Sequence, residues 1–298
     1  MNMLLWRILI GIPIIAAVSL LCWLDASCTI PGTWLMPFYL VATYFLCSEI
    51  LELLNGAGLH PRHSTVYIGT FWVMIMCWLS CYKTMPHIQE EGWDVAAKAC
   101  LLTLIAMAAG VIIAFLGEMA RFKSPGGNTI NLAGAVFAVT YVGLLSCFMI
   151  MLRIAYGIGA VLSLVIVTKL CDVGAYIIGR LFGRHKLVPG LSPGKTIEGA
   201  VGGIAFAILG AWLTIDVILP YVLERKTDTS FLGLIVFGVA VGLTGGLGDL
   251  AESLIKRDVG CKDSGRIVPG FGGFLDIFDS LLLAAPVAFG LWAFGLIR

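Results

Sequence analysis

Charged residues are scarce in this chain. Aspartate, glutamate, lysine and arginine together make up 12% of its 298 residues, whereas hydrophobic residues make up 59%. This composition excludes an ordinary soluble domain, in which about a quarter of residues are charged, and indicates a protein that crosses a membrane several times. The formal net charge is only +1. It argues against a nucleic-acid partner, because proteins that bind a phosphate backbone concentrate basic residues on one face.

Histidine is rare, and cysteine motifs are missing. The chain has four histidines and nine cysteines, and no two cysteines have CxxC spacing. Most of the cysteines lie within apolar runs, where cysteine usually acts as a small buried side chain. We therefore expect neither a disulfide framework nor a zinc site.

The N-terminal segment, MNMLLWRILIGIPIIAAVSLLCWLD, has the arginine and the apolar run of a secretory signal. The apolar run is longer than that of a typical signal, and residues 19–22 lack the small side chains that precede a cleavage site. We expect this segment to be an uncleaved first transmembrane helix.

Long apolar runs occupy most of the chain. About 20 apolar residues are needed to cross a bilayer, so the sequence predicts an all-α polytopic membrane protein with about nine transmembrane helices. Their expected limits are about 4–24, 34–53, 65–82, 94–117, 130–151, 155–179, 197–222, 231–255 and 274–296. The distribution of lysine and arginine predicts a cytoplasmic N-terminus and an outer C-terminus. Loops at about 180–196 and 256–273 then share the cytoplasmic side.

The two halves of the chain differ in polarity. Residues 1–150 are expected to form N-terminal scaffold helices, and residues 151–298 a C-terminal catalytic transmembrane domain. The second half carries most of the charges within or beside apolar runs: Lys169, Asp172, Glu198, Asp216, Asp249, Glu252, Asp276 and Asp279. Charges in such places are costly and mark functional sites. Glycines four residues apart, at 199 and 203 and at 238, 242 and 246, predict close helix packing.

Acidic and hydroxyl residues recur at helical spacing in the last two predicted spans. The first set is Asp249, Glu252, Ser253 and Lys256, and the second is Asp276, Asp279 and Ser280. Each set shares one helix face. Carboxylates without histidine favour Mg²⁺ over zinc, and two metal ions would suit phosphoryl or nucleotidyl transfer. For the first set, an internally paired polar seam remains the alternative.

Basic residues and glycines fill the two loops expected on the cytoplasmic side. The first loop contains Arg180, Arg184, Lys186, Ser192, Lys195 and Thr196; the second contains Arg257, Lys262, Asp263, Arg266, Gly272 and Gly273. Basic side chains neutralise phosphates, and glycines let backbone N–H groups approach anionic oxygens. The composition predicts polyphosphate binding, with merely solvated loops as the alternative. Lys169 and Asp172, just before the first loop, are spaced to pair with each other.

The GKT sequence at residues 194–196 is not a P-loop. The P-loop pattern requires glycine at position 189, where this chain has Pro189, and no β-strand is expected before the loop. We expect the neighbouring His185 to be an interfacial loop residue rather than a catalytic base.

Together these residues resemble the phosphatidate cytidylyltransferases, also called CDP-diacylglycerol synthases. The C-terminal signature of that family is matched by Ser253, Lys256, Arg257, Lys262, Asp263, Gly265, Pro269, Gly272, Gly273, Asp276 and Asp279. An upstream family pattern is matched by Asp172, Ala175, Tyr176, Gly179, Arg180, Ser192, Pro193, Lys195, Thr196, Glu198 and Gly199. The resemblance covers roughly residues 165–280, and the first half is similar only in being multi-helical.

Four positions depart from the family pattern. Phe271 replaces a histidine, Ile277 replaces an arginine, Gly194 replaces a lysine, and Val268 is a conservative change. The first three changes remove a basic or titratable group. The departures leave open an altered lipid preference, weaker activity or a related reaction that uses CTP.

The resemblance implies transfer of CMP from CTP to phosphatidic acid, which yields pyrophosphate and CDP-diacylglycerol for phospholipid synthesis. It implies Mg²⁺ held by Asp249 and Asp276, with Asp279, Glu252 or Asp172 as further ligands. The residues expected to bind the CTP and lipid phosphates are Lys195, Lys256, Arg257 and Lys262. Further substrate-binding residues are expected to be Arg180, Asp263, Gly272 and Gly273. Hydrogen bonds to the substrates are expected from Ser192, Thr196 and Ser253.

Two other functions remain open. A CTP-dependent polyprenol or lipid-alcohol kinase would release CDP instead of pyrophosphate. A transporter would use the intramembrane acids as an ion path, but the two halves show no matching broken helices. The expected partners are CTP, phosphatidic acid and the lipid bilayer, with a homodimer as a candidate assembly. The expected location is the bacterial inner membrane, with the active site facing the cytoplasm.

Overall fold

The protein folds into two compact units. The structure, a computed structural model, describes residues 3–84, 92–223, 229–265 and 272–297. The first unit consists of Met1–Ala155 and Asp258–Ile277, and the second of Tyr156–Arg257 and Phe278–Arg298. The first boundary falls near residue 150, where the sequence places the division, but the first unit also takes in a stretch of the C-terminal signature. The separate roles of the two halves stay predictions.

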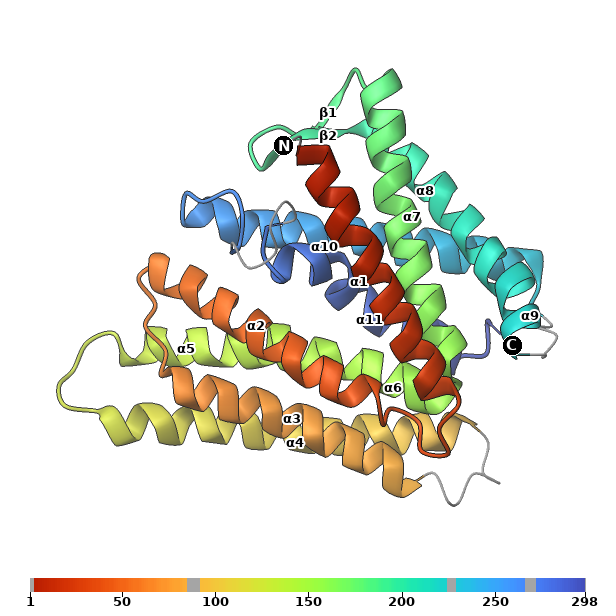
Figure 1. Ribbon diagram of the computed structural model, residues 1–298. Helices are drawn as coiled ribbons and strands as arrows, with labels where there is room; N and C mark the ends of the chain where they lie inside the picture. Colours follow the sequence, from red (N-terminus) through yellow and green to blue (C-terminus); the bar gives the residue numbers. More distant parts are fainter. Residues whose placement is uncertain (1–2, 85–91, 224–228, 266–271, 298) are drawn as a thin grey trace. The chain divides into compact units, whose positions relative to one another are not determined.

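The first unit is built from helices that its apolar runs dictate. They are α1 (Met3–Ala26), α2 (Leu35–Gly56), α3 (His63–Thr84), α4 (Gly92–Arg121), α5 (Asn128–Ala138) and α6 (Leu145–Tyr156). A π-helical segment, Val139–Leu144, joins α5 to α6, so the three segments form one continuous helix. Helices α3 and α4 lie side by side (Figure 1). Gly110 of α4 contributes to this, since a Cβ there would lie only 3.2 Å from Val73 Cγ2 of α3.

A buried ion pair anchors the connection between α1 and α2. The Asp25 carboxylate accepts the backbone N–H groups of Gly32, Trp34 and Leu35 at 3.1, 2.9 and 3.3 Å. Its Oδ2 also accepts Arg153 Nε of α6 at 2.5 Å. Asp25 is fully buried and Arg153 nearly so. Burying a carboxylate is costly unless it is fully hydrogen-bonded, and these four donors meet that condition.

The second unit contains the remaining helices and a small hairpin. Its helices are α7 (Ile158–Phe182), α8 (Ile197–Trp212), α9 (Leu219–Leu223), α10 (Phe231–Asp258) and α11 (Leu275–Ala293), with a π-helical segment, Leu213–Ile218, between α8 and α9. Helix α11 starts in the first unit and continues into the second. Glycines bring the helices together, as expected: a Cβ at Gly203 would lie 3.0 Å from Cys171 O of α7, and one at Gly238 2.6 Å from Ile208 Cα of α8. The expectation is wrong for Gly246, since a Cβ built there would have no described atom of another helix within 4 Å.

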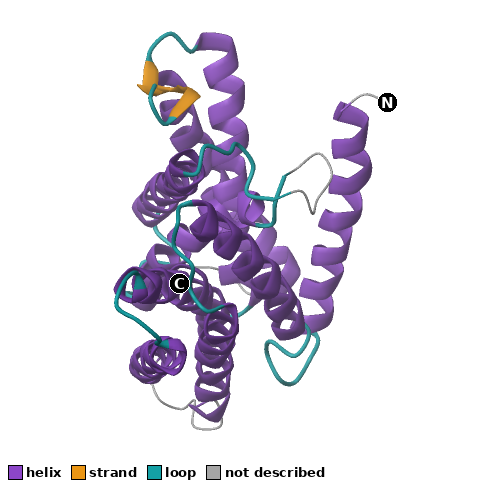
Figure 2. Cartoon of the chain, turned by 90° about the vertical axis from the view of Figure 1, so that its left-hand side faces the viewer, coloured by secondary structure: helices purple, strands orange, loops and turns teal. Residues whose placement is uncertain are grey.

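The short hairpin between α7 and α8 was not expected from the sequence. Strands β1 (Lys186–Val188) and β2 (Ser192–Thr196) pair antiparallel, with Lys186 opposite Thr196, and they appear as the orange element in Figure 2. A strand thus does precede GKT. The hairpin still differs from a P-loop, in which a strand feeds through a glycine-rich loop into a helix. Thr196 ends β2 and also caps α8, because its Oγ1 accepts the N–H of Gly199 at 3.1 Å.

The transmembrane prediction is confirmed in outline. Within the described residues, eight helices are long and apolar enough to cross a membrane: Leu35–Gly56, His63–Cys81, Ala97–Arg121, Asn128–Tyr156, Ile158–Phe182, Ile197–Tyr221, Phe231–Asp258 and Leu275–Ala293. They match eight of the nine expected spans to within a few residues. The remaining one, 4–24, corresponds to α1, of which Ala16–Ala26 forms a shorter apolar segment. The chain is an all-α, multi-pass membrane protein apart from the hairpin.

Candidate active site

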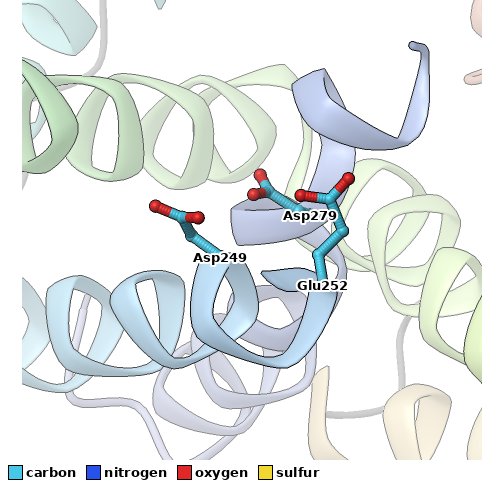
Figure 3. A group of neighbouring side chains, drawn as sticks. All are labelled: Asp249, Glu252 and Asp279. Atoms are coloured by element: carbon cyan, nitrogen blue, oxygen red, sulfur yellow. The ribbon is translucent and has the colours of Figure 1, made fainter. Parts of the chain in front are cut away.

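Three carboxylates gather in the second unit. Asp249 and Glu252 come from α10 and Asp279 from α11, and each offers one oxygen within 4.8 Å of the others. Figure 3 shows Asp249 and Glu252 on the same face of one helix and Asp279 reaching toward them from the other. Glu252 and Asp279 are buried, with 1% and 5% of their surface exposed, whereas Asp249 is half-buried. The group therefore has one accessible side, at Asp249.

Glycines of α10 let α11 come close enough to bring the acids together. A Cβ at Gly248 would overlap the backbone carbonyl of Asp279 and lie 3.0 Å from Ser280 Cα. Gly245 also faces α11, where a Cβ would make ordinary contact with Ser280 Cβ at 3.7 Å. The small-residue face of α10 thus fixes where the Asp279 side chain starts, which explains why glycines surround the charged positions.

Two lysines border the carboxylates. Lys195 of β2 places its Nζ 2.8 Å from Asp249 Oδ2 and 3.3 Å from Gly246 O. Lys256, one turn along α10 from Glu252, lies 2.6 Å from Glu252 Oε2 and is buried. Positive charge beside buried carboxylates offsets the cost of removing them from water. The same ammonium groups are suited to bind phosphate oxygens.

A polar chain joins α7 to the carboxylates. Lys169 Nζ lies 3.3 Å from Asp172 Oδ2, which confirms the expected pair, and it donates to Ser280 Oγ at 3.1 Å. Ser280 in turn donates its backbone N–H to Asp279 Oδ1 at 2.5 Å. Asp172 is therefore linked to Asp279 through Lys169 and Ser280. From the sequence, Lys169 is one of the charges that mark a functional site and the expected partner of Asp172, but its contact with Ser280 was not predicted.

The other predicted residues of the second unit lie around the hairpin. Arg180 is exposed and donates to Tyr176 OH at 2.8 Å. Arg257 Nε donates to Leu191 O at 3.4 Å, which joins the end of α10 to the hairpin turn. Ser253, on α10, and Ser192, at the start of β2, are half-buried.

Two of these positions have a clear local setting. Thr196 is buried, and its Oγ1 is occupied in capping α8. Gly194 is exposed, and no described atom lies within 4 Å of a Cβ built there. A lysine at position 194, as in the family pattern, would therefore meet no steric obstacle in the hairpin.

Residues of the C-terminal signature that belong to the first unit form their own network. Asp276 is not part of the three-carboxylate group found among the described residues. Its Oδ2 accepts Ser264 N at 3.1 Å, Ser264 Oγ at 3.0 Å and Gly273 N at 2.7 Å. Gly272 has φ +94°, and a Cβ there would lie 2.5 Å from Asp276 Oδ2. The two glycines thus let a carboxylate of the chain itself approach the backbone.

The remaining signature positions divide into described and undescribed ones. Lys262 and Asp263 are exposed, and Ile277 is half-buried at the start of α11. Arg266, Pro269 and Phe271 lie outside the described residues. The substrate roles predicted for Lys262, Asp263, Gly272 and Gly273 stay predictions.

The donor set of the carboxylate group suits a hard divalent cation. Its three members offer only carboxylate oxygens, and two of them are buried. Mg²⁺ prefers a few carboxylates and completes its coordination with water and substrate phosphates, whereas zinc favours histidine and cysteine. The residues present therefore fit Mg²⁺, and the metal-ligand roles predicted for Asp276 and Asp172 stay predictions.

Fold and site together define a class of protein: a multi-pass helical membrane enzyme whose acids and lysines are arranged for chemistry between phosphate groups. Comparison with known proteins is more specific. The cytidylyltransferase family matches residues 6–294, and the chain belongs to this family. This confirms the expected resemblance and makes the protein a nucleotidyltransferase.

Curated bacterial relatives agree with the family. The chain is 34% identical over 200 residues to the phosphatidate cytidylyltransferase of Staphylococcus haemolyticus, a match that covers 67% of this chain and 72% of the relative. It is 38% identical over 189 residues to that of Staphylococcus aureus, covering 63% and 67%. The match to the Staphylococcus epidermidis enzyme is 40% over 160 residues and spans 53% of this chain and 58% of the relative.

Proposed function

We propose that this protein transfers CMP from CTP to phosphatidate and so forms CDP-diacylglycerol and pyrophosphate. The observation that carries the proposal is the group of Asp249, Glu252 and Asp279 bordered by Lys195 and Lys256, in a chain of the cytidylyltransferase family. The names of the relatives support phosphatidate as the lipid substrate.

The reaction joins two polyanions, so charge is its main obstacle. An oxygen of the phosphatidate phosphate forms a bond to the α-phosphorus of CTP, and the bond from that phosphorus to the oxygen bridging to the β-phosphate breaks. Pyrophosphate leaves with the bonding electron pair. A phosphate monoester is largely ionised at neutral pH, so no strong general base is needed. Catalysis then rests on positioning and on charge neutralisation.

The residues of the second unit have distinct roles in this proposal. Lys195, half-buried on the hairpin beside the accessible Asp249, is placed to contact a phosphate. Lys256 is buried against Glu252 and holds that carboxylate in place. Asp172, through Lys169 and Ser280, does the same for Asp279.

We infer that Asp249, Glu252 and Asp279 would hold Mg²⁺. When bound, the ion would neutralise developing charge on the triphosphate. The chemical nature of the donors and their grouping within 4.8 Å support this assignment.

The proposed location is the bacterial cytoplasmic membrane, with the hairpin and the accessible side of the carboxylate group facing the cytoplasm. The basic loops and the bacterial relatives support it. A homodimer is the candidate assembly, which cross-linking in native membranes would test.

The test is to follow both ends of CTP. Purified protein in lipid nanodiscs would receive phosphatidate and CTP labelled on either the α- or the γ-phosphate. We expect α-label in the lipid and γ-label in pyrophosphate. Transfer of γ-label to an added polyprenol or lipid alcohol, with release of CDP, would instead establish the kinase.

A matched pair of variants ties the activity to the site. Asp279→Asn should abolish most lipid labelling, whereas Asp216→Asn, which changes an exposed acid of the same unit, should leave it unchanged. Equal activity in both variants would remove the carboxylate group from the mechanism.

A further inference from the structure

One buried acid in the first half of the chain has no part in the site described above. Glu49 lies on α2, and only 1% of its surface is exposed. Its Oε1 accepts the backbone N–H of Phe274 at 2.8 Å. Its Oε2 accepts the N–H of Leu275 at 2.8 Å and the hydroxyl of Ser264 at 2.8 Å. Glu49 therefore binds the signature segment at three points.

These contacts hold the N-terminus of α11, which begins at Leu275. The first N–H groups of a helix have no partner within it, and the helix dipole favours negative charge there. A carboxylate that accepts two of these N–H groups both satisfies the donors and fixes the direction in which the helix starts. Phe45 lies one turn before Glu49 on α2 and stacks on Phe274, with ring centroids 5.0 Å apart. This contact also holds the segment that leads into α11.

Glycines of the signature make room for this carboxylate. A Cβ at Gly265 would lie 2.6 Å from Glu49 Oε1, and a Cβ at Gly273 would overlap both Glu49 Oε2 and Ser264 Oγ. Neither position tolerates a larger residue while Glu49 stays in place. Gly265 and Gly273 thus leave space for the carboxylate of Glu49, a residue that is not part of the signature.

Ser264 connects Glu49 to Asp276. Its Oγ lies 2.8 Å from Glu49 Oε2 and 3.0 Å from Asp276 Oδ2, while its N–H donates to Asp276 Oδ2 at 3.1 Å. The one hydroxyl proton can be donated to only one of the two acids at a time. A change in the charge of Glu49 therefore alters the hydrogen bonding of Asp276 directly.

We propose that Glu49 is a positioning residue for cytidylyl transfer. It fixes Ser264 and the first turn of α11, and thereby the orientation of Asp276, for which a role in binding Mg²⁺ is predicted. It acts through these residues and need not touch a substrate. This inference rests on the proposed function for its activity measurement, but not for its structural one.

The experiment compares Glu49→Gln with Glu52→Gln. Both replace an acid of α2 by its amide, but Glu52 is exposed. In Glu49→Gln an NH₂ group faces one of the donors and the negative charge is lost. We expect kcat/KM to fall about 10–100-fold, as is typical when groups that orient metal ligands are changed. We also expect half-maximal activity to require more Mg²⁺, while Glu52→Gln stays at the wild-type level.

Hydrogen exchange gives a readout that does not need activity. In Glu49→Gln the amides of Phe274 and Leu275 should exchange at least about tenfold faster, since they lose a charged hydrogen-bond acceptor, while amides of α3 stay unchanged. Faster exchange in Glu49→Gln, together with a wild-type protein that transfers no CMP, would uphold the network and refute the proposed function. Unchanged exchange and unchanged kcat/KM would refute the positioning role.

A second variant covers the case in which Glu49→Gln does not fold. Ser264→Ala removes the link to Asp276 but leaves both N–H donors of α11 bound to Glu49. It should still fold, at a cost of about 1–3 kcal/mol in stability, and lose about tenfold in kcat/KM. Wild-type kinetics and Mg²⁺ dependence in Ser264→Ala would overturn the proposal.

Discussion

The ammonium of Lys195 lies 2.8 Å from the carboxylate of Asp249, so the hairpin and the acids of α10 form one charged surface in the second unit. Because Asp249 is only half-buried, this ammonium is also available to an incoming phosphate. The first prediction follows from this pair.

Replacing Lys195 by methionine should lower kcat/KM for CTP about 10–100-fold, the equivalent of one hydrogen bond to a charged group. Lys186→Met is the matched control, since Lys186 is an exposed lysine of the same hairpin. Steady-state kinetics in nanodiscs would measure both. Similar losses in the two variants would mean that only the overall charge of the hairpin matters.

Replacement by alanine should affect stability in opposite ways at Gly248 and Gly246 of α10. Gly248→Ala pushes a methyl group into the backbone of Asp279 and should destabilise the protein by about 1–3 kcal/mol and impair activity. Gly246→Ala meets no described atom and should be neutral or stabilising by about 0.5–1 kcal/mol. Thermal unfolding in detergent would rank the two variants. A destabilised Gly246→Ala beside a tolerated Gly248→Ala would show that the helices pack differently.

The Asp25–Arg153 pair predicts a stability effect without a catalytic one. Arg153→Met leaves a fully buried carboxylate without its cation and should cost about 3–5 kcal/mol. The double variant Asp25→Asn with Arg153→Met removes the uncompensated charge and should recover part of this loss. Unfolding of both variants in mixed micelles measures the difference. Additive effects would show that the two residues do not interact.

Metal binding can be measured apart from turnover. Mn²⁺ reports on Mg²⁺ sites by electron paramagnetic resonance, and Asp279→Asn should weaken its binding about 100-fold. Asp216→Asn serves as the control because its side chain is exposed and outside the carboxylate group. Full Mn²⁺ affinity in Asp279→Asn would contradict the assignment of this acid as a ligand.

The sequence predicted the transmembrane helices well because hydropathy is a local property. It also predicted the pairing of Lys169 with Asp172, which lie three residues apart on one helix. Local spacing could not show which of Asp276 and Asp279 joins the carboxylates of α10, since both lie on one face of α11. What separates them is tertiary: Asp276 turns back to Ser264 and Gly273, whereas Asp279 meets α10 where Gly248 lets the helices touch.

Glu49 was missed for a different reason. The first half was expected to be plain scaffold, and the two acids in the run FLCSEILELL, Glu49 and Glu52, carry little weight beside the dense charges of the second half. Its partners are backbone N–H groups more than two hundred residues away, which leave no residue-type signal. The available signal was the acid inside an apolar run, which is costly unless it has a role.

The position of Thr196 limits where residues can be inserted between α7 and α8. Because it ends β2 and also caps α8, a residue inserted between Lys195 and Thr196 would shift the lysine away from Asp249 or detach the helix cap. Extra residues can be absorbed at the exposed turn around Pro189 and Gly190. That turn is therefore the place for an inserted tag or fluorophore, and lengthening it should leave both the lysine and the helix in register.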